Sequence, residues 1–82
     1  MRTGMLWFDN DRDRKFEDKL QRATTRYLTK YGQKPTVCYV HPSMMLGVSP
    51  NLAGMVIRGT NTVLPHHFWL GHEEGVERKS AA

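Results

Sequence analysis

The apolar and polar positions in the first half of the chain predict a short strand followed by one helix. Residues 5–8 form an apolar run of strand length, and an acidic turn follows at residues 9–11. Beyond the turn, apolar residues recur at helical spacing to about Tyr31, and Gly32 and Pro35 then favour a helix end. A side chain of the turn region is expected to cap the helix start, and the candidates are Asp9, Asn10, Asp11 and Asp13.

Two stripes run along this predicted helix when successive residues are placed about 100° apart. The apolar stripe, which we expect to face a core, consists of Phe16, Leu20, Ala23, Tyr27 and Tyr31. Beside it lies a stripe about 80° wide that we call the basic stripe. It consists of Arg12, Lys15, Lys19, Arg22, Arg26 and Lys30. The acidic residues of the segment fall elsewhere, so the basic stripe is the clearest pattern that a core does not explain.

The second half of the chain reads as strands and loops. Residues 36–40 are apolar on both alternating faces, which is typical of an interior strand. Residues 43–54 are rich in Gly, Ser and Pro and are predicted to form a long loop. Residues 55–58 and 62–64 flank the turn-forming sequence Gly-Thr-Asn and predict a hairpin. A last strand is expected at residues 67–71.

Together these elements predict an α+β fold in which one amphipathic helix packs on a small, mostly antiparallel sheet, in the order β-α-β-β-β. Residues 1–72 are expected to form a single domain, and residues 73–82 a flexible charged tail. Whether the first strand runs parallel or antiparallel to its neighbour stays open.

Length and charge narrow the function classes. The chain has 82 residues and a net charge of +4, and residues 1–34 carry that whole excess with nine Lys and Arg against five Asp and Glu. A chain this short excludes a large enzyme with its own cofactor domain. We expect a cytoplasmic protein without a membrane partner, because no apolar run reaches the roughly 18–20 residues of a membrane span and the first residues lack a signal-peptide core.

The single cysteine, Cys38, lies in an apolar run and is expected to be a small buried residue, with a reactive thiol as the alternative. A domain of this size without disulfides or a metal motif has few means of stabilisation, so we expect a homo-oligomer or a subunit of a larger assembly. Adaptable and aromatic side chains suit such an interface, and the candidates are Met44, Met45 and Leu46 together with Trp69 or Trp7. Filling of the core is the alternative role for them.

Four histidines, His41, His66, His67 and His72, favour a second hypothesis, a small metal-dependent or hydrolytic protein that uses His41 with His66 or His67. In an extended strand His66 and His72 would lie about 20 Å apart, and His67 would point to the other face. Cys38 or Ser43 near His41 offers a nucleophile and base only by proximity in sequence. We therefore assign no catalytic residue, no metal ligand and no cofactor.

The basic stripe supports the leading hypothesis, a small non-catalytic binding module whose helix contacts an acidic partner, either nucleic acid or protein. Self-association through apolar loop or strand-edge surface is expected in addition. The alternative for the stripe is an ordinary solvated helix face. A third hypothesis for the whole chain is a structural subunit that completes a larger assembly.

Overall fold

The computed structural model describes residues 4–52 and 54–72 and contains one long helix and five strands. The elements are β1 (Gly4–Phe8), α1 (Phe16–Tyr31), β2 (Val37–Val40), the one-turn 3₁₀ helix η1 (Pro42–Met44), β3 (Asn51–Leu52), β4 (Met55–Gly59) and β5 (His67–Gly71). The predicted tail at residues 73–82, and the domain boundary at its start, lie outside the described residues.

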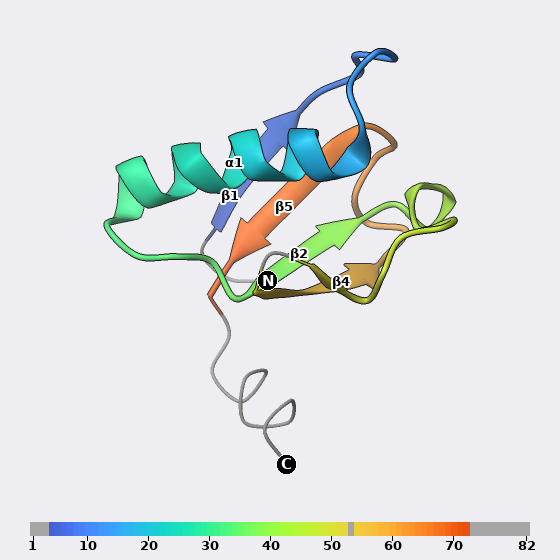
Figure 1. Ribbon diagram of the computed structural model, residues 1–82. Coiled ribbons are helices and arrows are strands. Elements are labelled where there is room, and N and C mark those ends of the chain that lie inside the picture. The colour runs from blue at the N-terminus through green and yellow to red at the C-terminus, as the bar shows by residue number, and fades with distance from the viewer. Residues whose placement is uncertain (1–3, 53, 73–82) are drawn as a thin grey trace.

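The five strands form one sheet in the order β1-β5-β2-β4-β3. Neighbouring strands are antiparallel except β2 and β4, which run parallel. Helix α1 packs on one face of this sheet and crosses in front of β1 and β5 in Figure 1. The predicted α+β class with a single helix on a mostly antiparallel sheet is confirmed, and the first strand is antiparallel to its neighbour, β5.

The predicted end of α1 is confirmed, and its predicted start is wrong. Gly32 adopts the left-handed conformation, with φ of 74°, and its N–H donates to the carbonyl of Leu28 at 2.8 Å. At the other end the helix begins at Phe16, and Lys15 in the N-cap position makes no capping bond with its side chain. None of the four predicted caps is adjacent to the first helical turn, which instead carries the acids Glu17 and Asp18 where they suit the helix dipole.

The core lies between α1 and the face of the sheet that α1 covers. The strand register places Met5, Leu70, Cys38 and Ile57 side by side across four strands. Each of these residues is at most 7% exposed. From the helix, Leu20, Ala23 and Tyr27 are buried against them, and Phe16 and Tyr31 pack at the margin. The apolar stripe therefore faces the core, as predicted.

The predicted hairpin of residues 55–58 with 62–64 is wrong. Strand β4 pairs with β3 on one side, where Leu52 opposes Met55, and with β2 on the other, where Val37 opposes Val56. Strand β4 therefore already has a partner strand on each side. Residues 62–64 form a turn and loop instead of a strand, and Val63 in this segment is buried. The predicted loop at residues 43–54 also contains β3 and part of η1.

The opposite face of the sheet, which we call the uncovered face, has no helix of the described chain on it. The row next to the core row consists of Leu6, Trp69, Tyr39 and Arg58. The β1 side chains on this face are exposed, with Leu6 at 60% and Phe8 at 55%. The prediction that the strand at residues 36–40 is interior is confirmed, because β2 lies between β5 and β4.

Candidate binding groove

Two adjoining hollows lie along the side of α1 that faces β1. The first has a volume of about 620 Å³ and is lined by Trp7, Arg14, Asp18, Gln21, Arg22, Thr25 and Arg26. The second has a volume of about 500 Å³ and is lined by Met5, Leu6, Trp7, Arg26, Thr29 and Lys30. Because Trp7 and Arg26 line both hollows, we treat them as one feature, the α1–β1 groove.

Three cations of the basic stripe line this groove. Arg22, Arg26 and Lys30 are four residues apart on α1, so they occupy successive turns of one helix face, and all three are exposed. Among the described residues none of the three has an ion-pair partner, although Lys30 Nζ lies 5.4 Å from the centre of the Tyr31 ring. Their charges are therefore available to a ligand.

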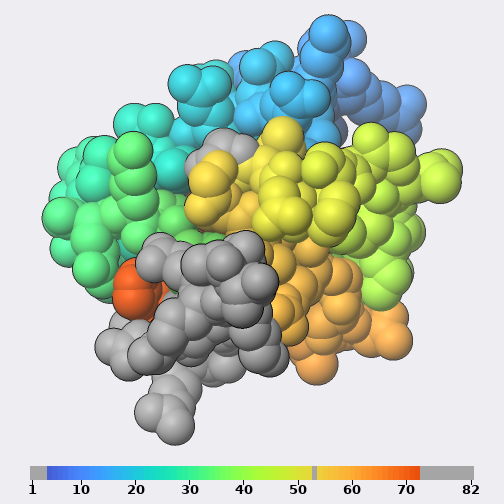
Figure 2. Space-filling view, turned by 60° about the horizontal axis from the view of Figure 1, so that its bottom comes forward, coloured from blue at the N-terminus to red at the C-terminus, as the bar shows by residue number. Residues whose placement is uncertain are grey.

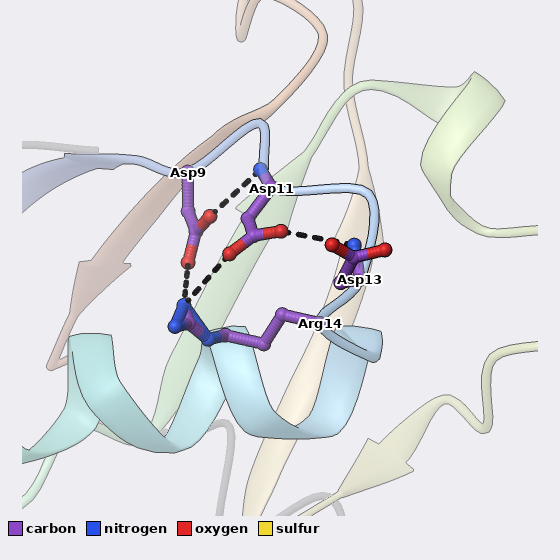
Figure 3. A network of polar contacts seen from close by, with 4 residues as sticks. All are labelled: Asp9, Asp11, Asp13 and Arg14. Carbon is purple, nitrogen blue, oxygen red and sulfur yellow. Dashed lines mark hydrogen bonds and ion pairs between the residues drawn. The ribbon is translucent and has the colours of Figure 1, made fainter.

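A fourth cation of the groove, Arg14, is held by the acidic turn that precedes the helix (Figure 3). Its guanidinium lies 3.4 Å from the Asp11 carboxylate and 3.9 Å from that of Asp9. The two carboxylates also accept backbone N–H groups two residues ahead, Asp9 from Asp11 at 3.0 Å and Asp11 from Asp13 at 2.9 Å. The acids predicted to cap the helix therefore stabilise consecutive turns and neutralise Arg14.

The remaining members of the basic stripe do not line the groove. Arg12 and Lys15 precede Phe16, so the helical spacing that placed them in the stripe does not apply to them. Lys19 is only 7% exposed, because it stands one turn before the buried Ala23 at the border of the apolar stripe. A long lysine stem packs readily against apolar neighbours in such a position.

The basic stripe does not include Trp7, Asp18, Gln21 or Thr25, which also line the groove. The three helical residues share a face with Arg22 and Arg26, so a wider angular window on the helix would have included them. Trp7 reaches the groove from another element, and only the packing of α1 against the sheet brings it there. Its Nε1 is buried and has no hydrogen-bond partner among the described residues.

The interface candidates lie in different surroundings. Met44 and Met45 are partly buried and pack against the core, whereas Leu46 is 93% exposed. The segment after β2 that holds these three residues, coloured yellow-green, projects at one side of the molecule in Figure 2. Trp69 is half-buried on the uncovered face, with its ring centre 5.8 Å from that of Tyr39.

The register of β2 and β5 brings His41 and His67 to the same end of the sheet, since each is one residue beyond the Val40–Phe68 pair. His41 is the N-cap of η1, where its Nδ1 accepts the Ser43 N–H at 3.1 Å and lies 2.8 Å from the Ser43 Oγ. His66 has a positive φ of 66° in the turn before β5, and His67 Nδ1 donates to the Pro65 carbonyl at 2.9 Å. His72 is exposed beyond the other end of β5.

Within residues 4–52 and 54–72, no three His, Cys, Asp or Glu side chains lie close enough together to hold a metal ion. Cys38 is a free, fully buried thiol, and burial raises its pKa to about 12. A thiol in that state is a poor nucleophile at neutral pH, because the thiolate is the reactive form. In the same described part of the chain, no helix combines the length and the apolar character needed to cross a bilayer.

Comparison with protein-family models, with curated proteins and with solved structures found no match to this chain. The geometry of the groove is therefore the basis for any proposal about function.

Proposed function

We propose that this chain is a small non-catalytic binding module that holds an acidic partner in the α1–β1 groove. The observation that carries the proposal is the row of Arg22, Arg26 and Lys30 along one wall of a groove that also contains Trp7. Cations without intramolecular partners keep most of their attraction for a ligand, because no internal ion pair has to be broken first. The lining has four cations, Arg14, Arg22, Arg26 and Lys30, and one acid, Asp18, so the described groove has a net positive charge.

The spacing of the cations suits a linear polyanion. Residues four apart on a helix are separated by about 6 Å along its axis, so the two arginines and the lysine present three charges along roughly 12 Å of groove. Each guanidinium can donate two parallel hydrogen bonds to a carboxylate or a phosphate. Both acidic protein segments and nucleic acids fit this general requirement.

Fluorescence anisotropy of labelled DNA, RNA and glutamate-rich peptides tests the proposal across a salt titration. With three cations engaged, the logarithm of the nucleic-acid binding constant should fall with the logarithm of salt concentration with a slope of about −2 to −3. The double variant Arg22→Glu/Arg26→Glu should lower affinity for any ligand bound in the groove at least about 100-fold.

A matched control is available because Lys34 and Arg58 are exposed and lie outside the groove. The variant Lys34→Glu/Arg58→Glu changes the net charge by the same four units and should retain most of the binding. Equal loss in both double variants would show that only overall charge matters. Unchanged binding in the groove variant, or no binding of any acidic probe to the wild type at low salt, would overturn the proposal.

Self-association and a cytoplasmic location are further parts of the proposal. The exposed Leu46 and Leu64 support association, because each offers apolar area that a second copy can cover away from the β1 edge. The buried free thiol of Cys38 needs no oxidising compartment. Light scattering over a range of protein concentrations should give a mass above that of one chain, and a monomer mass throughout would contradict self-association.

A further inference from the structure

Strand β1 is an edge strand, and β5 is its neighbour in the described sheet. The Asp9 N–H donates to the His66 carbonyl at 3.0 Å, so the backbone groups of Asp9 point toward β5. Because these directions alternate along an antiparallel pair, the N–H and C=O of Phe8, Leu6 and Gly4 point away from β5. Tyr31 confirms this direction, since its hydroxyl donates to the outward Gly4 carbonyl at 3.1 Å.

The outward backbone groups of Leu6 and Phe8 border the α1–β1 groove. Met5 and Trp7 point toward the helix side of the sheet, where the groove contains Arg26 and Lys30. Leu6 and Phe8 point to the uncovered face and are exposed. A strand added to β1 would therefore have cations on one of its faces and apolar side chains on the other.

We propose that the α1–β1 groove binds an extended protein segment with alternating acidic and apolar residues, which pairs with β1 as a sixth strand of the sheet. This inference rests on the proposed function and names the class of partner. The acidic residues of the segment would meet Arg22, Arg26 and Lys30, and the apolar residues would lie beside Leu6 and Phe8. Addition of a strand to an exposed sheet edge is an established mode of peptide recognition.

The backbone chemistry of the edge favours a protein over a nucleic acid. Leu6 presents both an N–H donor and a C=O acceptor at the edge. Another strand satisfies both groups, whereas a phosphodiester offers acceptors and leaves the carbonyl without a donor. The apolar Leu6 and Phe8 side chains also match a peptide better than a phosphate chain.

The charge of the groove favours an acidic segment over a second copy of this chain. Antiparallel pairing of two β1 strands would place both α1 helices on the same face of a continuous sheet. Each copy would then turn Arg22, Arg26 and Lys30 toward the same groups of the other copy. Like charges brought together in this way oppose the pairing, and an acidic strand turns the same groups into attractions.

A synthetic peptide that alternates Glu and Val over about eight residues, within the usual range of strand lengths, is the probe. A peptide of the same composition with its glutamates and valines in separate blocks is the first control. The alternating peptide should bind at least about tenfold more tightly, because only its two faces match the two sides of β1. The protein variant Arg22→Glu/Arg26→Glu should lose binding to the alternating peptide.

Backbone N-methylation of the peptide separates strand pairing from charge attraction without any change in the protein. In an antiparallel complex the amides that face β1 belong to the valines, and in a parallel complex they belong to the glutamates. Methylation of the facing set should lower affinity at least about tenfold, since several hydrogen bonds are lost, whereas methylation of the other set should have little effect. Hydrogen exchange should slow at the amides of Leu6 and Phe8 when the unmodified peptide binds.

The outcomes distinguish this inference from the proposed function. Binding of the peptide with equal tolerance of both methylated sets would overturn strand pairing and leave charge attraction alone. Binding of oligonucleotides but not of the peptide would also overturn it, while the proposed function would stand. Protection of Leu6 and Phe8 amides in a peptide-free dimer would assign the edge to a second copy and overturn it too. Failure of peptide and oligonucleotides alike would overturn both.

Discussion

The two edges of the sheet differ in length, composition and surroundings. The edge at β3 consists of two residues, Asn51 and Leu52, directly after Pro50. There the Ser49 Oγ donates to the Asn51 carbonyl at 2.9 Å. The edge at β1 has five residues and exposes the apolar side chains of Leu6 and Phe8.

This contrast shows two ways in which one small sheet limits the pairing of its edge strands with other chains. An exposed edge invites pairing with other chains, and proteins commonly limit this with short strands, prolines or nearby charges. The β3 edge has the first two of these features. The β1 edge has the third, in Arg22, Arg26 and Lys30 across the groove. We infer that the charges at β1 select among partners, whereas the short β3 edge offers little to pair with.

The largest expected effect on the free energy of unfolding concerns β2, the middle strand of the sheet, which lies between the two edges. Burial raises the pKa of Cys38 to about 12, whereas an unfolded cysteine ionises near pH 9. The native state keeps the proton over this interval and the unfolded state loses it, so the free energy of unfolding should fall by about 1.4 kcal/mol per pH unit between about pH 9 and pH 12. Below pH 9 both states are protonated and the contribution is constant.

Urea unfolding of the wild type and of Cys38→Ala at a series of alkaline pH values measures this effect. The variant should lack the cysteine contribution to the slope, while other groups, such as Tyr27, titrate in both proteins. Parallel curves for the two proteins would contradict the prediction.

The second effect compares one glycine near each edge. A Cβ on Gly4 would overlap the Trp69 ring and the Leu70 carbonyl, so Gly4→Ala should cost about 1–3 kcal/mol. Gly54, next to β4 in the turn after β3, has open space around it but a φ of 77°. Gly54→Ala should therefore cost only about 1 kcal/mol. Chemical denaturation of both variants measures the two losses in the free energy of unfolding. A larger loss for Gly54→Ala than for Gly4→Ala would contradict the close packing of Gly4 against Trp69 and Leu70.

The third effect concerns the bond between α1 and the β1 edge. Tyr31→Phe removes the hydroxyl that donates to the Gly4 carbonyl and should lower the free energy of unfolding by about 1 kcal/mol. The helix should remain intact, because the ring packs against Tyr27 with centres 4.6 Å apart. Thermal unfolding with circular dichroism checks both expectations, and an unchanged stability would show that this bond contributes nothing.

The smallest effect comes from the outer surface of β1 itself. Leu6→Lys should change the free energy of unfolding by no more than about 0.5 kcal/mol, since the side chain is 60% exposed. Met5→Ala on the covered face of the same strand is the contrasting variant. Met5 is 7% exposed, so its truncation should cost about 2 kcal/mol or more. Similar losses in the two variants would mean that the uncovered face is packed in solution.

Local patterns were sufficient for part of the candidate site. The helical spacing of Arg22, Arg26 and Lys30 placed them on one face, and the structure has them there. The same spacing misplaced Arg12 and Lys15, because the start of a helix depends on where the preceding acidic turn ends. It also could not show that Lys19 is covered by its surroundings.

The sequence by itself determined the elements whose signals are local. The end of α1 follows from Gly32, the apolar stripe from side-chain spacing, and β5 from a short apolar run at residues 67–71. Only the tertiary structure decided which strands became neighbours. The parallel pairing of β2 with β4 occupied the side of β4 that a hairpin with residues 62–64 would have used, and β1 was left at an edge. Strand pairing depends on contacts between residues distant in the chain, and those contacts also brought Trp7 and the β1 edge to the arginines of α1.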